Sequence, residues 1–151
     1  MVSTKFDISM LFPPERNDYA GPTIAVWFLI LFNIVGTLRG VIHMFYRDSG
    51  AQSFATMNVN VDGGKNIVAM LGHWGGLQLI MSVFIWMVLW RYREFIPLMI
   101  AEVAIEQLIR IVVHRMKPVT TARTPPGKPL TLIVLLLAAI ILIVSLMRNE
   151  P

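Results

Sequence analysis

The chain has no cysteine among its 151 residues and few charged residues. Disulfide bonds, thiolate metal ligands and cysteine redox chemistry are therefore excluded. Asp, Glu, Lys and Arg make up 15% of the chain, whereas apolar residues make up 56%. The net charge of +4 is not gathered in one patch, because Lys and Arg are scattered near the ends of apolar runs. We therefore expect no nucleic-acid partner.

The apolar residues are segregated into four long runs, each near the ~20 residues that a helix needs to cross a ~30 Å hydrocarbon core. They predict helices at about 23–46, 66–90, 95–116 and 130–146, within a transmembrane domain spanning 22–147 and followed by a short tail, 148–151. The polar segment 1–21 lacks the basic start, apolar core and cleavage site of a secretory signal, so the first run is expected to be retained. The sequence predicts an all-α integral membrane protein, a four-helix bundle whose first partner is the lipid bilayer.

The prolines and the lengths of the polar segments between the runs predict how the helices connect. Pro22 and Pro97 each suit a first helical turn, where a missing N–H costs little. The short connection 91–94 predicts that the second and third helices pack antiparallel against each other. The first connection, 47–65, is long and polar, and weak alternation over 54–61 is compatible with a short strand or hairpin above the bundle.

The third run carries four ionisable residues at four-residue spacing: Glu102, Glu106, Arg110 and His114. Because a helix repeats every ~3.6 residues, such steps stay near one face while drifting roughly 40° per step. A charge at mid-membrane costs about 2.5–3.5 kcal/mol on insertion scales, so these side chains usually face a partner or a cavity. The stripe therefore predicts a site inside the protein.

Two other helices bring polar residues to the same layer. Connectivity places the end of the first helix, the start of the second and the end of the third on one membrane side. The layer is expected to contain Arg39, His43, His73 and Gln78 beside the stripe, with Asn33, Thr37 and Gln107 extending it. The two arginines offset the two glutamates. One interpretation is a structural ion-pair network that fixes helix register, and the other is a functional cavity.

The cavity interpretation predicts acid–base chemistry on a lipophilic molecule such as a quinone or an isoprenoid. Glu102, farther from Arg110, is expected to be the proton donor, Glu106 the ionised charge stabiliser, and His73 a proton shuttle. A metal cofactor is disfavoured because Glu-x-x-His and His-Glu-x-x-His spacings are absent and two arginines repel a cation. The fourth run has only Thr131 and Ser145 as polar residues, so it is expected to lie outside the site.

A glycine-rich stretch, Gly72-His73-Trp74-Gly75-Gly76-Leu77, lies in the second run. Gly72 and Gly76 form a small-xxx-small pair, and with Gly75 they predict close packing against a neighbouring helix. Trp74, Trp86 and Trp90 are expected to be packing or interfacial aromatics.

Four short spans, a polar first loop, this glycine-rich stretch and an arginine late in the third helix resemble the DoxX-like superfamily, over roughly residues 20–147. The likeness is closest to its small four-helix members of unknown function. It implies a compact bundle in the bacterial inner membrane, and one branch is associated with thiosulfate:quinone oxidoreductase, which implies a quinone-facing role. Gly75, Gly76 and Arg110 correspond by position, whereas the Glu102/Glu106 pair matches no motif of that family.

Three functions remain open from the sequence. The first is a membrane pocket protein, with or without enzymatic activity, that handles a small lipophilic molecule. The second is a non-catalytic subunit of a larger membrane complex, or a homo-oligomer, whose polar layer is structural. The third is a proton- or ion-conducting transporter, for which four helices give little room.

Overall fold

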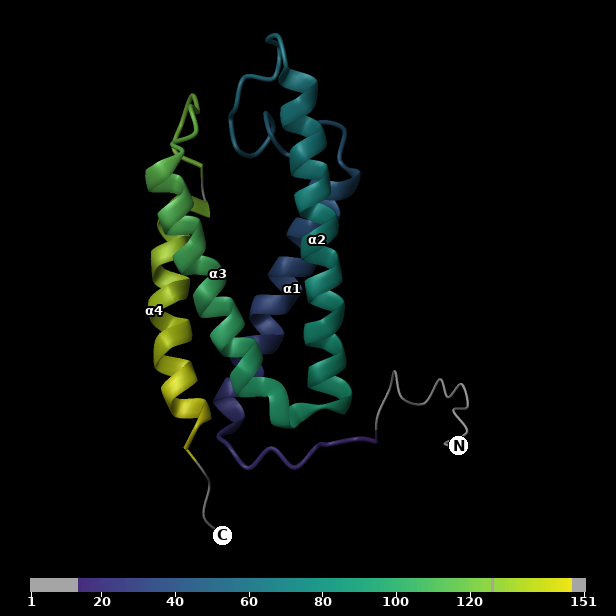
Figure 1. Cartoon of the computed structure of the whole chain (residues 1–151), viewed down its shortest axis with the longest axis vertical. Coiled ribbons are helices and arrows are strands. Elements are labelled where there is room, and N and C mark those ends of the chain that lie inside the picture. Colours follow the sequence, from purple (N-terminus) through teal and green to yellow (C-terminus); the bar gives the residue numbers. More distant parts are fainter. Residues whose placement is uncertain (1–13, 126, 148–151) are drawn as a thin grey trace, which may run out of the picture.

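The computed structural model describes residues 14–125 and 127–147, and these residues form helices joined by turns and loops (Figure 1). In chain order the elements are α1 (Thr23–Phe45), α2 (Gly64–Arg91), the 3-10 turn η2 (Arg93–Phe95), α3 (Ile96–Met116) and α4 (Gly127–Ser145). The all-α prediction is confirmed, and the helices begin and end close to the predicted bounds. Residues 54–61 form no strand, and residues 1–13 and 148–151 lie outside the described residues.

Local sequence sets the helix starts. Pro22 precedes α1 with an extended backbone, at φ −63° and ψ 139°. Gly63 precedes α2 with φ +82°, a left-handed conformation that glycine adopts without steric cost. Pro97 lies in the first turn of α3, where its missing N–H is tolerated. The first residue of each of these helices therefore follows from a nearby proline or glycine whose backbone conformation suits a helix start.

The helices pair as two hairpins, α1 with α2 and α3 with α4 (Figure 1). The prediction that α2 and α3 pack against each other was wrong: the turn between them is tight, but the helices diverge from it. The reason is a glycine contact on the other face of α2. A Cβ atom at Gly75 would lie only 2.6 Å from the Cβ of His43, and one at Gly40 would lie 3.3 Å from the carbonyl oxygen of Gly75. The close backbone approach fixes α2 on α1.

The two hairpins meet at the end of the molecule that holds η2, which we call the packed end. Its fully buried side chains are Ala25 and Leu29 of α1, Ile96, Ile100 and Val103 of the α3 segment, and Ala138 of α4. The chain before α1 crosses this end. There the Tyr19 hydroxyl donates to the carbonyl oxygen of Ser145 (3.1 Å), and burial raises the pKa of the Tyr19 phenol.

The connection between α1 and α2 is organised by Asp48 at the opposite end. Its carboxylate accepts hydrogen bonds from the backbone N–H groups of Gly50 (2.9 Å), Gln52 (3.0 Å) and Ser53 (2.7 Å). Slight burial raises the pKa of Asp48, but these hydrogen bonds outweigh it, so the pKa lies below its ordinary value.

The loops of the two hairpins are joined at this end. The Thr56 hydroxyl donates to the carbonyl oxygen of Arg123 (3.0 Å) and accepts from its N–H (3.1 Å), and the N–H of Ala122 donates to the Thr56 carbonyl (3.0 Å). The hairpins are therefore linked at both ends of the molecule.

By length and composition, α1 and α2 are apolar enough to cross a membrane. Only 22% of the most apolar window of α1 and 11% of that of α2 are buried inside the molecule. Their apolar side chains therefore lie mostly on the outside. The apolar part of α4, Pro129–Ser145, is shorter.

Candidate functional site

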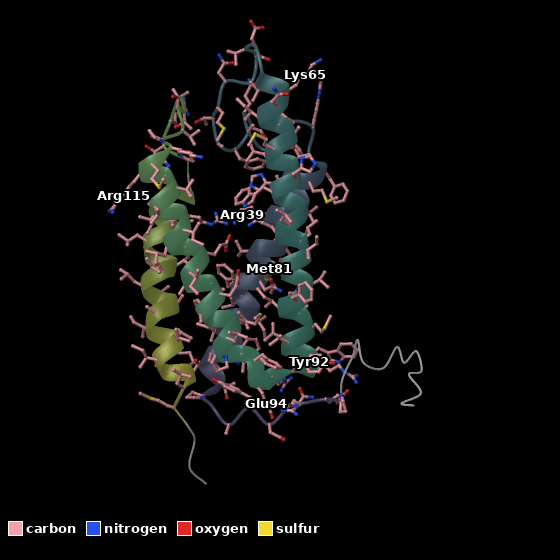
Figure 2. All side chains as sticks on the ribbon, viewed as in Figure 1. Arg39, Lys65, Met81, Tyr92, Glu94 and Arg115 are labelled. Carbon is pink, nitrogen blue, oxygen red and sulfur yellow. The ribbon has the colours of Figure 1, made fainter. Side chains whose placement is uncertain are left out.

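A cavity of about 730 Å³ lies between the two hairpins where they diverge from the packed end. In Figure 2, Arg39 and Met81 lie between α3 and α2 at this level. The lining is mostly apolar, and its larger side chains are Phe28, Leu31, Phe32, Val35, Trp74, Leu77, Met81, Ile85, Leu130 and Val134. The polar lining residues are Asn33, Arg39, Gln78, Ser82, Glu102, Glu106, Gln107 and Thr131. The volume is typical of small-molecule sites, which span ~300–1,000 Å³.

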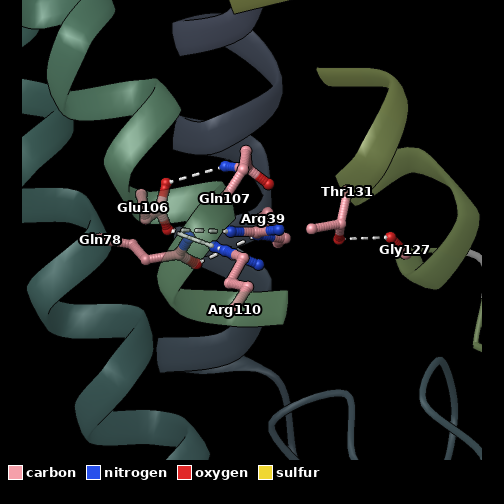
Figure 3. Close-up of polar contacts among 7 residues, drawn as sticks. All are labelled: Arg39, Gln78, Glu106, Gln107, Arg110, Gly127 and Thr131. Atoms are coloured by element: carbon pink, nitrogen blue, oxygen red, sulfur yellow. Dashed lines mark hydrogen bonds and ion pairs between the residues drawn. The ribbon is translucent and has the colours of Figure 1, made fainter. Parts of the chain in front are cut away.

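Glu106 is the centre of a polar layer in this cavity (Figure 3). Its Oε1 accepts hydrogen bonds from Nε of Arg110 (3.1 Å) and from Nη2 of the same residue. Nη2 of Arg39 lies 3.9 Å from the same oxygen, and Gln107 Nε2 donates to Oε2 (3.3 Å). Nε of Arg39 also donates to Oε1 of Gln78 (3.3 Å). The layer thus joins α1, α2 and α3 across the gap between the hairpins.

Trp74 of α2 lies against both arginines. The guanidinium carbon of Arg39 is 5.0 Å from its ring centroid, and that of Arg110 is 4.9 Å away, within the range of cation–π interactions. The His43 ring is 4.9 Å from the same indole, and His43 Nδ1 is 2.7 Å from the carbonyl oxygen of Ser49. The interpretation of Trp74 as a packing or interfacial aromatic was incomplete. Its position four residues before Gln78 was the available signal, because the two share a helix face.

Glu102 lies one helical turn from Glu106, toward the packed end, and lines the cavity. Its carboxyl makes no hydrogen bond or ion pair with any residue that the structure describes. The two carboxyl groups of α3 therefore differ: Glu106 is held by arginines, and Glu102 is available to a molecule in the cavity.

Two of the predicted histidines lie outside this cluster. His73 is exposed, and its Nδ1 is 3.0 Å from the carbonyl oxygen of Ala69 in its own helix. The expected position of His73 beside the glutamates was wrong, because each residue turns a helix by ~100° and it is Trp74 that faces the cavity. His114 makes no contact of this kind with the described residues, since the stripe has drifted off the cavity face by that turn.

The glycines differ in how closely they pack. Gly75 is buried at the point where α1 and α2 cross. A Cβ at Gly72 would lie 3.4 Å from Ser49 Oγ, and one at Gly76 would lie 3.9 Å from Met44 Sδ, which is ordinary contact. Of the three glycines that the sequence predicts to pack closely, Gly75 makes the closest approach, whereas Gly72 and Gly76 make ordinary contacts.

The fourth helix forms one wall of the cavity, so its predicted position outside the site was wrong. Gly127, Leu130, Thr131 and Val134 contribute to the lining. The Thr131 hydroxyl donates to the carbonyl oxygen of Gly127 (3.0 Å), and the helix thereby presents a largely apolar wall (Figure 3). An apolar helix was expected to face lipid, but it also suits an apolar cavity.

Three further residues of α1 and α2 line the cavity: Asn33, which the sequence placed at the margin of the polar layer, and Gly36 and Ser82, which it did not single out. Nδ2 of Asn33 donates to the Ser82 carbonyl (3.0 Å), and this buried hydrogen bond joins the two helices. Gly36 leaves open space, because a Cβ there would meet only Ser82 Oγ at 3.8 Å and Asn33 Oδ1 at 4.0 Å. Spacing alone did not separate these residues from ordinary packing positions.

Comparison of the chain with protein-family models, with curated proteins and with solved structures found no match. Among the described residues, no group of three His, Asp or Glu side chains is placed to hold a metal ion. What the site can do therefore has to be argued from its own geometry.

Proposed function

We propose that this protein is a four-pass helical membrane protein whose cavity binds a small lipophilic molecule by its polar head. The outward-facing side chains support the membrane part. Trp27 of α1 is 59% exposed, Leu38 is 61% exposed and Ile143 of α4 is 64% exposed. Soluble monomers rarely expose contiguous apolar surface on this scale. Charged groups such as Lys65, Arg115 and Glu94 lie toward the two ends (Figure 2).

The proposal rests on the cavity, whose lining is mostly apolar and whose charged groups gather in the polar layer around Glu106. Phe28, Leu31 and Ile85 line it toward the packed end, and Arg39 and Gln78 line it toward the loops. A few polar groups that converge in an apolar pocket fix the orientation of a ligand. An amphiphile of the size of a quinone head with part of its chain, or of an isoprenoid, meets both requirements.

The unequal carboxyl groups suit acid–base chemistry at the head of the bound molecule. Arg110 and Arg39 hold Glu106 as the charge stabiliser, and Glu102, which forms no hydrogen bond or ion pair with the described side chains, is the group that exchanges a proton with the ligand. His73 has no part in this proposal.

The proposal is tested by filling the apolar part of the cavity without touching the polar layer. Gly36→Leu places a branched side chain in the open space beside Ser82, whereas Gly36→Ala adds only a methyl group that fits there. We expect native mass spectrometry and organic extraction of protein in mild detergent to find a lipophilic molecule in the wild type and in Gly36→Ala. Gly36→Leu should retain at least about tenfold less, which corresponds to a loss of ~1.4 kcal/mol of binding.

Equal retention by Gly36→Leu, or a wild type that retains no such molecule, contradicts the proposal. Stoichiometric protein partners without a small molecule would instead identify an accessory subunit of a membrane complex.

A further inference from the structure

We infer that the head group bound in this cavity carries one negative charge, as a carboxylate or phosphodiester does, and that Arg39 is its principal ligand. The inference rests on the proposed function and narrows its ligand to amphiphiles with an anionic head group, which a neutral quinone or isoprenoid alcohol does not have. It is carried by the balance of charge around Glu106 and by the donors that face the cavity.

Two guanidinium groups share one carboxylate oxygen. Arg110 donates to Glu106 Oε1 through both Nε and Nη2, whereas Nη2 of Arg39 is 3.9 Å from that oxygen. The closer arginine therefore takes most of the charge of Glu106. When Glu102 holds the proton that the proposed function assigns to it, the two arginines and the two glutamates together keep a net charge of +1, and Arg39 is the less compensated cation.

The other groups near Arg39 do not remove this charge. Trp74 lies against both arginines, but an indole has no net charge. Glu102 forms no ion pair with a described residue. An uncompensated cation in apolar surroundings is costly, and the cost falls when an anion pairs with it.

The hydrogen-bonding groups at this point are donors. Arg39 lines the cavity, and its Nη1 has no hydrogen-bond partner among the described residues. Gln78 lies beside it and uses its Oε1 to accept from Arg39, which leaves its amide N–H groups for a ligand. Guanidinium and amide donors suit an oxyanion, which accepts hydrogen bonds and cannot donate them. A diphosphate has more negative charge than the layer balances, so the head is a single anion.

The test uses two probes of equal chain length, palmitate and hexadecanol, and the full chain in nanodiscs of zwitterionic phosphatidylcholine. The pH is set so that palmitate is ionised. Binding is followed by native mass spectrometry. We expect palmitate to bind at least about tenfold more tightly than hexadecanol, because a charge-assisted hydrogen bond contributes roughly 1.5–3 kcal/mol. This comparison needs no variant, so it stands even if a substitution impairs folding.

Variants then assign the effect to Arg39. Arg39→Gln should bring the two probes close to equal affinity, whereas Arg39→Lys should keep part of the preference because it keeps the charge. Arg115→Gln is the control, since Arg115 is exposed on α3 and does not line the cavity. Unchanged preference in Arg39→Gln overturns the assignment to Arg39.

Phosphatidylglycerol added to the nanodiscs separates two sources of the anion. Displacement of palmitate supports a phospholipid head group as the natural ligand, and its absence supports a free carboxylate. Equal binding of palmitate and hexadecanol overturns the anionic head group but leaves the proposed function standing. Failure of both probes, together with no retained lipophilic molecule in the wild type, overturns both.

Discussion

The packed end and the rest of the helical region, which holds the cavity and which we call the cavity half, are built from the same helices. They differ in the polarity of the side chains between the helices and in how closely the helices pack. At the packed end, α1 and α3 contribute Leu29, Ile100 and Val103, all fully buried and apolar. Farther along, the same helices contribute Arg39 and Glu106, which face a cavity. Three helices meet around α1 at one end, whereas the hairpins stand apart at the other. The difference indicates that the packed end supplies most of the stability and leaves the other half free to bind.

Among the described residues, the two hairpins are joined beside the cavity by the polar layer and by loop contacts, an arrangement that suits a ligand that must enter between helices. The hairpins are linked at the loop end through Thr56 and Arg123 and at the other end through the core. Between these two links, α2 and α3 make few contacts (Figure 1). Substitutions at the packed end should therefore change the free energy of unfolding, whereas substitutions that line the cavity should change it much less.

The largest expected effect is at the packed end. Leu29→Ala leaves a void among fully buried neighbours and should reduce the free energy of unfolding by about 2–5 kcal/mol. Leu31→Ala is the matched control two residues away, because Leu31 is 62% exposed and lines the cavity. Thermal denaturation in detergent measures both. Equal losses in the two variants would contradict the division into two halves.

The next effect is at the crossing of α1 and α2. Gly75→Ala places a Cβ 2.6 Å from Met44 N as well as from the His43 side chain, so the helices must separate. We expect a loss of about 1–3 kcal/mol, typical of overpacking. Gly76→Ala, whose Cβ would lie 3.9 Å from Met44 Sδ, should be neutral or slightly stabilising because alanine favours helix more than glycine. Equivalent melting curves for the two would show that the close approach is not at Gly75.

The smallest effect is at the loop above the cavity. The lowered pKa of Asp48 means that its contribution is present above its unfolded pKa of 3.8 and is lost as the pH falls through the folded value. Because Asp48 is only partly buried and its hydrogen bonds to Gln52 and Ser53 lie at the surface, Asp48→Asn should cost less than about 1 kcal/mol. The protection factors of the Gln52 and Ser53 amides, corrected for the pH dependence of intrinsic exchange, should fall in the variant at neutral pH and in the wild type only in acid.

Unchanged exchange in Asp48→Asn would show that these backbone hydrogen bonds do not depend on the carboxylate charge. Such a loop would be held by the buried Ala51 and by its contacts with the other hairpin.

Much of the local structure was predictable. The apolar runs and the prolines placed all four helices, because helix formation and its interruption depend on residues close in the chain. The pairing of Glu106 with Arg110 was also predictable, because residues four apart lie on one helix face. The membrane setting and the ligand stay predictions.

The partners of each helix were not predictable in the same way. A short turn after α2 favoured packing against α3, but the absent side chain of Gly75 let α1 approach instead. The site therefore differs from the predicted one, because α4 forms a wall of the cavity and Trp74 lies against the arginines of the polar layer. His73, one residue away, was left outside.

The sequence alone therefore determined where the helices lie and which of their faces carry charge, since both depend on periodicity and on chain-breaking residues. Only the tertiary structure decided how each helix is rotated about its axis and which helix it meets. Rotation depends on the steric fit of small side chains at helix crossings, and a turn of ~100° exchanges one residue for the next at the cavity wall. This steric fit depends on the surfaces of both helices, so it cannot be read from the sequence of either helix alone.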